Sequence, residues 1–188
     1  DLQPCLQKLQ LELMNSADVA PEIYWESNRR VLLEENPGLL EALEYTPDQA
    51  DTYFAVQAIN GQMTLQYRKG SEEYYMHSSI NPEREAELWA KRHIQKGYEL
   101  YYVFGMGLGY HVIELLKQAP GSRVIVLELE PYLVKLSFCY QNLESYLKSG
   151  RLEVICEPQE MVLLRSLREE KDKMLLVHEP SLVHMQEG

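Results

Sequence analysis

Cysteine, basic residues and long apolar runs are all scarce in this 188-residue chain. The three cysteines, Cys5, Cys139 and Cys156, are odd in number and far apart, so they indicate reduced thiols rather than a disulfide framework. No apolar run reaches the roughly twenty residues of a membrane-spanning helix, and no basic start followed by an apolar stretch marks the chain for secretion. These absences predict a cytoplasmic protein without a membrane partner.

The charge balance is acidic, with 18 Lys and Arg against 29 Asp and Glu and a formal net charge of -11. Basic residues occur singly or in pairs and form no stripe of the kind that a phosphate backbone requires, which argues against a nucleic-acid partner. One small anionic ligand remains compatible with this charge, because its binding depends on local dipoles more than on net charge.

Signatures of metal binding and of hydrolysis are also missing. The stretch HEPSLVH at residues 178–184 is not H-E-x-x-H, and no D-x-D pair is present to hold the divalent ion of a sugar nucleotide. No Ser-His-Asp or Cys-His arrangement is legible. The spacing of the residues therefore predicts no metal site.

The first predicted region, residues 1–50, is helical. Leucines recur on one face over residues 2–13, a pattern that suits core packing or a partner surface. A second helix should end near Asn36, because Pro37 lacks an amide hydrogen and Gly38 permits a sharp turn. A short leucine-rich helix should follow it.

In the second and third predicted regions, residues 51–80 and 81–188, the spacing of apolar residues differs from that of the helical region. Two β-rich runs joined through Asn60-Gly61 predict a hairpin, and EEYYMHS adds a third strand, giving a small antiparallel β-meander. From residue 81 strands and helices alternate, which predicts an α/β fold, a Rossmann-like parallel sheet with flanking helices on both faces. The expected strands are 100–104, 123–127, 152–155 and 174–177, and the expected helices between them are 110–118, 132–147 and 159–169. Because a doubly wound sheet usually has more strands, we expect the chain to be a fragment of a longer protein.

A glycine-rich turn, VFGMGLGYHVIELL, follows the first strand of that sheet. Ligands of such sheets bind beyond the carboxyl ends of the strands, so Gly105, Gly107 and Gly109 are candidates to approach a nucleotide closely. Glu128, at the end of the next strand, is spaced as a ribose-binding carboxylate would be, with Glu130 facing solvent beside it. The alternative is that the glycines only allow tight packing of strand and helix.

The spacing G-x-G-x-G is not the dinucleotide fingerprint and is nearer to that of S-adenosylmethionine-dependent methyltransferases, as is ELEP. Val103 departs from that pattern, since those enzymes usually carry an acidic residue two places before the first glycine. A catalytic proline-aromatic motif after the fourth strand is absent as well.

Polar side chains near this turn complete the candidate site. His77 and Ser78 precede a helix that begins at Pro82 and is capped by Ser79 or Asn81, and they reach the glycine turn if the chain folds back over the sheet. Two more candidates lie at the sheet itself. His111 follows the glycines and is either a pocket residue or a packed polar residue. His178 either ends the last strand as a site residue or starts a link to a following domain.

Three stretches in this order resemble the N-terminal domain of the motility associated factor family: NRRVLLEENPGLLEAL, YMHSSINPEREAELWA, and VFGMGLGYHVIELL followed by VLELEP. The resemblance runs over residues 24–182, and HSSINPEREAE is its specific element. It implies a bacterial glycosyltransferase that adds nonulosonic acids to flagellin, with a Rossmann-like N-terminal domain before a sialyltransferase-like catalytic domain. The chain stops before that second domain, so the resemblance implies no active site within it.

The resemblance thus implies an accessory Rossmann-like domain that binds a nucleotide or positions the acceptor. A nucleotide or a CMP-type nucleotide sugar is compatible as its ligand, whose identity the sequence leaves open. Its expected partners are the missing C-terminal catalytic domain and flagellin or another protein acceptor, and a homo-oligomer is compatible. Two alternatives stay open. One is a methyltransferase-like domain with S-adenosylmethionine, and the other is a protein-interaction module that uses the helix over residues 2–13.

Overall fold

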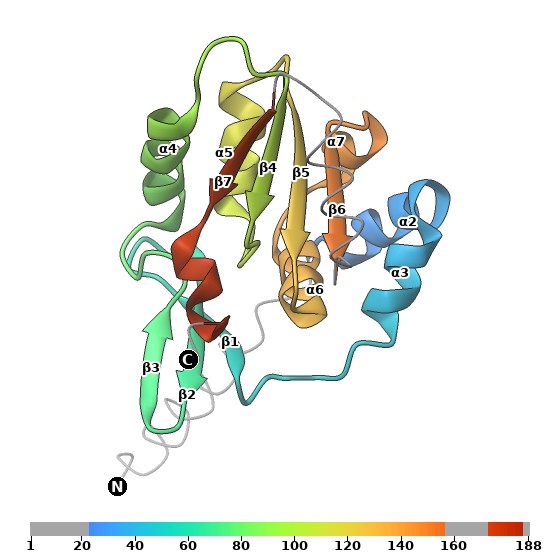
Figure 1. Ribbon diagram of the computed structural model, residues 1–188. Coiled ribbons are helices and arrows are strands. Elements are labelled where there is room, and N and C mark those ends of the chain that lie inside the picture. Colours follow the sequence, from blue (N-terminus) through green and yellow to red (C-terminus); the bar gives the residue numbers. More distant parts are fainter. Residues whose placement is uncertain (1–22, 157–172, 186–188) are drawn as a thin grey trace, which may run out of the picture.

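The computed structural model describes residues 23–156 and 173–185 (Figure 1). The helices predicted over 2–13 and 159–169 lie outside these ranges. No helix of the described part is long and apolar enough to cross a membrane. The predicted division at residues 50 and 80 stays a prediction.

The helical region begins with α2 (Trp25–Glu35) and α3 (Pro37–Glu44). Asn36 separates them, and its side chain accepts a hydrogen bond of 3.0 Å from the Leu39 amide, which caps α3. The helix end predicted at Pro37 and the short helix after it are therefore confirmed. The apolar faces of both helices are buried, through Val31 and Leu32 in α2 and three leucines in α3.

The meander consists of β1 (Tyr53–Gln57), β2 (Met63–Lys69) and β3 (Glu72–Tyr75), paired antiparallel in that order. Its apolar side packs against Leu108 of the glycine turn and against the helix that starts at residue 131. The predicted hairpin and third strand are confirmed. This packing fixes the segment after β3 beside the glycine turn.

The parallel sheet contains β4 (Leu100–Phe104), β5 (Arg123–Glu128), β6 (Leu152–Cys156) and β7 (Lys173–Val177), in the order β6-β5-β4-β7. The chain adds strands on one side of β4 and then returns to add β7 on the other side. The strand order thus reverses between β4 and β7, which makes their carboxyl ends the topological switch point. The predicted α/β fold with a Rossmann-like parallel sheet is confirmed.

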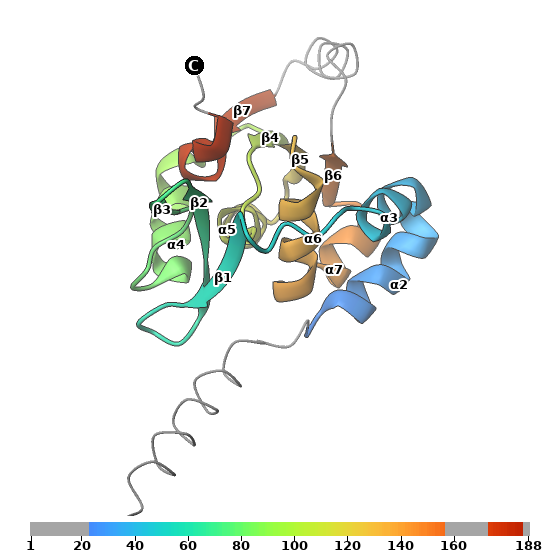
Figure 2. The same ribbon diagram turned by 90° about the horizontal axis from the view of Figure 1, so that it is seen from below.

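The described α-helices gather on one side of this sheet (Figure 2). They share one hydrophobic core with the sheet face that includes Tyr101, Val103 and Val126. The crossovers β4 to β5 and β5 to β6 run in the same direction, so right-handed connections put their helices on the same face. The α-helices of the described residues cover this one face, so helices on the second face stay a prediction. The connection from β6 to β7 lies outside the described residues.

The single helix predicted over residues 132–147 is wrong, because two helices, α6 (Pro131–Tyr140) and α7 (Glu144–Lys148), occupy the segment. The buried Asn28 of α2 explains the break. Its amide nitrogen donates to the carbonyls of Phe138 and Gln141 at 2.8 and 2.7 Å, and its oxygen accepts from the Leu143 amide at 3.0 Å. One side chain from another helix thus satisfies the backbone groups that a continuous helix would pair internally.

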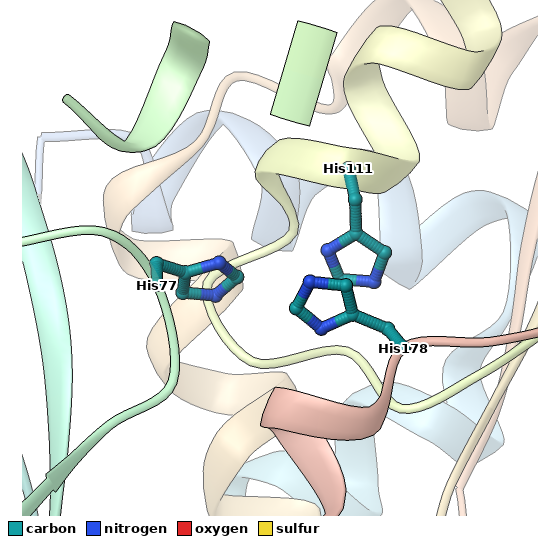
Figure 3. A group of neighbouring side chains, drawn as sticks. All are labelled: His77, His111 and His178. Carbon is teal, nitrogen blue, oxygen red and sulfur yellow. The ribbon is translucent and has the colours of Figure 1, made fainter. Parts of the chain in front are cut away.

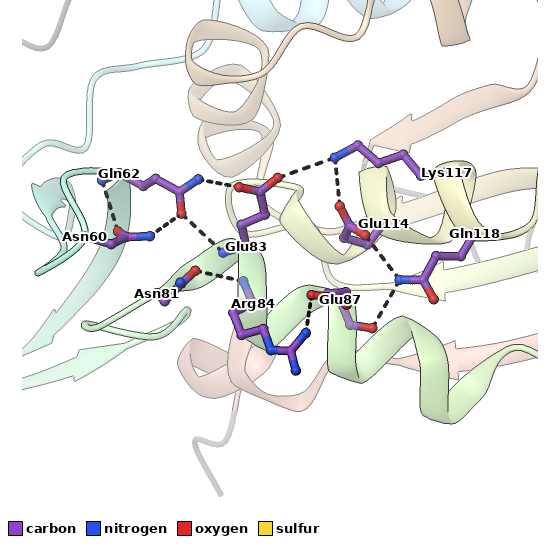
Figure 4. Close-up of polar contacts among 9 residues, drawn as sticks. All are labelled: Asn60, Gln62, Asn81, Glu83, Arg84, Glu87, Glu114, Lys117 and Gln118. Atoms are coloured by element: carbon purple, nitrogen blue, oxygen red, sulfur yellow. Dashed lines mark hydrogen bonds and ion pairs between the residues drawn. The ribbon is translucent and has the colours of Figure 1, made fainter.

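The helix α4 (Pro82–His93) is capped by Asn81, whose side chain accepts from the Arg84 amide at 2.9 Å. The predicted cap is confirmed, with Asn81 rather than Ser79 as its residue. A surface network of polar side chains then ties α4 to the hairpin and to α5 (Tyr110–Gln118) (Figure 4). In that network Glu83 accepts from Gln62 at 2.8 Å and lies 3.5 Å from the Lys117 ammonium. The start of α4 is thereby tied both to the β1–β2 hairpin and to α5.

Candidate functional site at the glycine turn

The glycine turn leaves β4 at the switch point and enters α5. The Gly105 amide donates to the Leu127 carbonyl at 3.0 Å, and the Gly109 amide donates to the Met106 carbonyl at 2.8 Å. Gly107, between them, has φ of +50°, in the left-handed region where a side chain is strained. The turn is therefore tight and anchored to the neighbouring strand.

Protein side chains fill the space beside Gly107. A Cβ atom added there would overlap His77 Nε2 and would lie 2.8 Å from Ser181 Oγ. The second of these residues belongs to the 3-10 helix η1 (Glu179–Met185), which follows β7. In this structure the close backbone approach that the glycines permit is made by the chain itself.

Three histidines meet at this point (Figure 3). His77 comes from the segment after β3, His111 from the first turn of α5 and His178 from the end of β7, and all three are buried. One ring nitrogen of each lies within 4.8 Å of the others. The His111 and His178 rings are stacked, with centroids 3.7 Å apart and planes 7° from parallel. Three segments that are distant in the sequence thus form one imidazole cluster.

The hydrogen bonds of the cluster decide which nitrogens carry protons. His77 Nε2 accepts from the Leu108 amide at 2.8 Å, so its proton sits on Nδ1. His111 Nε2 lies 2.8 Å from the Gly105 carbonyl, which can only accept, so this nitrogen is the donor. His111 Nδ1 is then left with a lone pair that is buried and has no hydrogen-bond partner.

Burial keeps all three imidazoles neutral. It lowers the pKa of His111 to about 4, against an opposing contribution from the Gly105 carbonyl. Burial also lowers the pKa of His77 and of His178 well below the ordinary value, and the nearby imidazoles add to this effect. At neutral pH the cluster therefore offers lone pairs instead of positive charge.

Two further residues enclose the cluster. Trp89 of α4 meets the His111 and His178 rings edge to face, at centroid distances of 5.3 and 5.6 Å. Ser181 Oγ lies 2.6 Å from His178 Nδ1. Neither residue was predicted from the sequence. Only Ser181 had a local signal, since it stands three residues after His178 in a short helical turn.

Glu128 lies behind the glycine turn and is fully buried. Its Oε2 accepts from the Met106 amide at 2.8 Å and its Oε1 from the Glu130 amide at 3.0 Å. Burial raises its pKa to about 7, and the amide hydrogen bonds oppose this shift. Both oxygens are thus engaged with backbone, and ribose binding by this carboxylate stays a prediction.

The remaining predicted residues lie around the cluster. Ser78 accepts from the Ile80 and Asn81 amides through Oγ, so it organises the start of α4. The solvent-facing position expected for Glu130 is wrong. Its carboxylate is half-buried, accepts from the Tyr132 amide at 3.1 Å at the start of α6, and accepts from Gln49 at 2.8 Å.

Comparison with known proteins identifies a solved structure with a similar fold. No protein-family model matches the sequence, and no curated protein matches it. Among solved structures, the MAf glycosyltransferase from Magnetospirillum magneticum AMB-1 is similar, with a TM-score of 0.63 and 16% sequence identity over 82% of this chain. The aligned part covers 32% of that glycosyltransferase, so the chain spans about a third of its length. The similarity establishes a shared fold with one region of a glycosyltransferase.

Proposed function

We propose that this chain is an accessory Rossmann-like domain of a longer glycosyltransferase and that it acts on the protein acceptor instead of the sugar donor. The observation that carries the proposal is the fold similarity to one region of a MAf glycosyltransferase, over 82% of this chain. The resemblance of the HSSINPEREAE stretch to motility associated factors supports the same assignment. Flagellin is the acceptor that this resemblance suggests.

The geometry of the switch point supports a role away from the donor nucleotide. His77 and Ser181 occupy the space beside Gly107 that a nucleotide phosphate would take. Both oxygens of Glu128 already accept backbone hydrogen bonds. A CMP-type nucleotide sugar or S-adenosylmethionine would have to displace η1 and break these contacts, each at a cost in affinity.

A kinetic experiment on the full-length protein tests this division of labour. Deletion of residues 23–185 should reduce sugar transfer to the protein acceptor and leave hydrolysis of the donor sugar nucleotide unchanged. Loss of donor hydrolysis in the deletion variant, with the remaining domain folded, would overturn the proposal.

Ligand binding by the chain itself is the companion test. A thermal-shift panel with CMP, CMP-sialic acid, UDP-sugars, NAD, S-adenosylmethionine and S-adenosylhomocysteine should give no stabilisation. A ligand at a hundredfold excess over its Kd would stabilise the chain by about 2.7 kcal/mol, so binding would be visible. Stabilisation by a CMP compound would reassign donor recognition to this domain, and stabilisation by an S-adenosyl compound would favour the methyltransferase alternative.

A further inference from the structure

The three clustered imidazoles offer a site that the proposed function does not use. A ring nitrogen from each of three separate segments lies within 4.8 Å of the other two (Figure 3). Neutral imidazole is a common protein ligand for zinc, copper, nickel and iron. We propose that His77, His111 and His178 bind one divalent cation of the zinc class and so cross-link the β3–α4 segment, α5 and the end of β7.

The orphaned nitrogen of His111 is the first independent sign of a ligand. Nδ1 is buried and has no hydrogen-bond partner, whereas buried polar atoms in proteins are nearly always paired. The other nitrogen of the ring donates to the Gly105 carbonyl. Metal-binding histidines typically show this combination, with one nitrogen on the metal and the other held by a carbonyl or carboxylate. His111 therefore presents Nδ1 to the cation.

The other two rings contribute in different ways. The Ser181 hydroxyl can accept a hydrogen bond from the protonated Nδ1 of His178, which leaves the lone pair of Nε2 for the cation. The lone pair of His77 Nε2 is held by the Leu108 amide in this structure. Binding of the cation exchanges that hydrogen bond for a metal bond, so the Leu108 amide reports on occupancy of the site.

Coordination requires a small rearrangement of the rings. Zn–N bonds of 2.0–2.1 Å in a tetrahedron place ligand nitrogens about 3.3 Å apart, so the separation of up to 4.8 Å contracts by about 1.5 Å. The stacked His111 and His178 rings have their lone pairs in parallel planes, and one ring must therefore tilt. Three protein ligands leave a fourth position for water or a small anion.

The donor set also sets selectivity. The cluster contains three imidazoles and, among the described residues, no carboxylate. Magnesium and calcium prefer oxygen ligands, so the site should discriminate against both in favour of zinc, cobalt, nickel and copper.

The test uses the 188-residue chain without an affinity tag, stripped with a chelator and titrated with Co2+ and then Zn2+. We expect one equivalent of Co2+ to give a visible d–d spectrum that Zn2+ abolishes, and no response to Mg2+ or Ca2+. His111→Gln and His178→Gln should weaken binding by about a hundredfold or more, because even the loss of an outer-shell partner costs 10–100-fold. His93→Gln, which changes a histidine outside the cluster, should bind as the wild-type chain does.

Zinc K-edge X-ray absorption of the wild-type chain gives a measurement that does not depend on the folding of variants. Scattering from three imidazoles, together with an amide shift of Leu108 on metal addition, would support the site. Sulfur scattering, fewer than three imidazoles, or equal affinity in His111→Gln and wild type would overturn it. Absence of Co2+ binding up to millimolar concentration would also overturn it. The nucleotide panel and the deletion experiment are unaffected by any of these outcomes.

Discussion

Two polar clusters join the same parts of the molecule in opposite ways. The exposed network of Figure 4 links α4 to the hairpin and to α5 through charged groups such as Glu83 and Lys117, whose side chains are about half exposed. The cluster of Figure 3 links the segment before α4, the start of α5 and the end of β7 through neutral imidazoles that are buried. The network of Figure 4 is therefore exposed to solvent, and the histidine cluster of Figure 3 is shielded from it.

This difference in burial determines how much each polar contact contributes to stability. Exposed ion pairs are screened and each typically contributes less than about 1 kcal/mol. A buried polar group without a partner costs about 1–3 kcal/mol, so every bond in a buried cluster matters. Substitutions should therefore have large effects at the switch point and in the core and small effects on the surface network.

The largest effect is expected from Gly107→Val. The new side chain would overlap His77 and Ser181 and would hold a β-branched residue at a φ of +50°. We expect a loss of about 4 kcal/mol or more in the free energy of unfolding, in the range of the most damaging single substitutions. Urea unfolding followed by far-UV circular dichroism measures it.

Substitutions at two other glycines separate the cost of backbone strain from the cost of side-chain overlap. Gly70 also has a positive φ, but a Cβ atom there meets nothing within 4 Å, so Gly70→Ala should cost only the strain, about 1 kcal/mol. Gly121→Val has open space and no positive φ, and it should be close to neutral. If Gly107→Val were no worse than Gly70→Ala, the side-chain contacts at the switch point would have to be looser than the structure has them.

Asn28→Ala should come next. It removes three hydrogen bonds to buried backbone groups between α6 and α7, and at about 1 kcal/mol or more for each bond the loss is about 3–4 kcal/mol. Chemical denaturation provides the value. The control is Asn142→Ala, an exposed asparagine in the same connection, which should lose less than about 0.5 kcal/mol. Equal losses in the two variants would contradict the role given to Asn28.

Glu128→Gln should change how stability depends on pH. The pKa of Glu128 is raised to about 7 in the folded chain from 4.5, so the folded state binds its proton more tightly than the unfolded state does. The stabilisation from that proton is full below pH 4.5 and is lost as pH rises through 7. Between pH 4.5 and pH 7 and above, the free energy of unfolding of the wild type should fall by about 3 kcal/mol relative to that of Glu128→Gln, at 1.36 kcal/mol per pKa unit.

Urea titrations of both proteins at several pH values from 4.5 to 8 measure that difference. A constant difference in stability between wild type and Glu128→Gln over the whole range would mean that Glu128 titrates as an ordinary carboxyl group.

The smallest effect is expected from Arg84→Met in the surface network. The side chains of Arg84 and Glu87 are each about half exposed, so their ion pair is open to solvent screening. The change should cost less than about 0.5 kcal/mol in physiological salt. A loss above 2 kcal/mol in the free energy of unfolding, measured by thermal denaturation, would mean that this network stabilises the fold as strongly as the buried cluster does.

Much of the fold could be predicted from the sequence because local signals specify it. Pro37, the hairpin glycine and the alternation of apolar runs set the positions of helices and strands with little help from distant contacts. The break between α6 and α7 could not be predicted, since it depends on Asn28 from a helix more than a hundred residues earlier. Nothing in the sequence around residue 141 marks that contact.

The candidate site was predictable only in part. The glycine turn and the position of His111 followed from the strand–turn–helix pattern, and His178 followed from the end of a strand. That the three histidines meet depends on β7 lying beside β4 and on the meander holding His77 against the turn. No metal-ligand spacing is visible in the sequence, because the three residues come from three separate segments. Trp89 was missed for the same reason.

The place of β7 has a consequence for the order of assembly during synthesis. β7 is the last described strand to be made, yet it pairs with β4, the first strand of the sheet, and it brings His178 to the other two histidines. Until it docks, Gly107 and the imidazole rings of His77 and His111 lack their final neighbour. The cluster therefore closes only after the ribosome has delivered β7, later than the contacts that β4, β5 and the meander make among themselves.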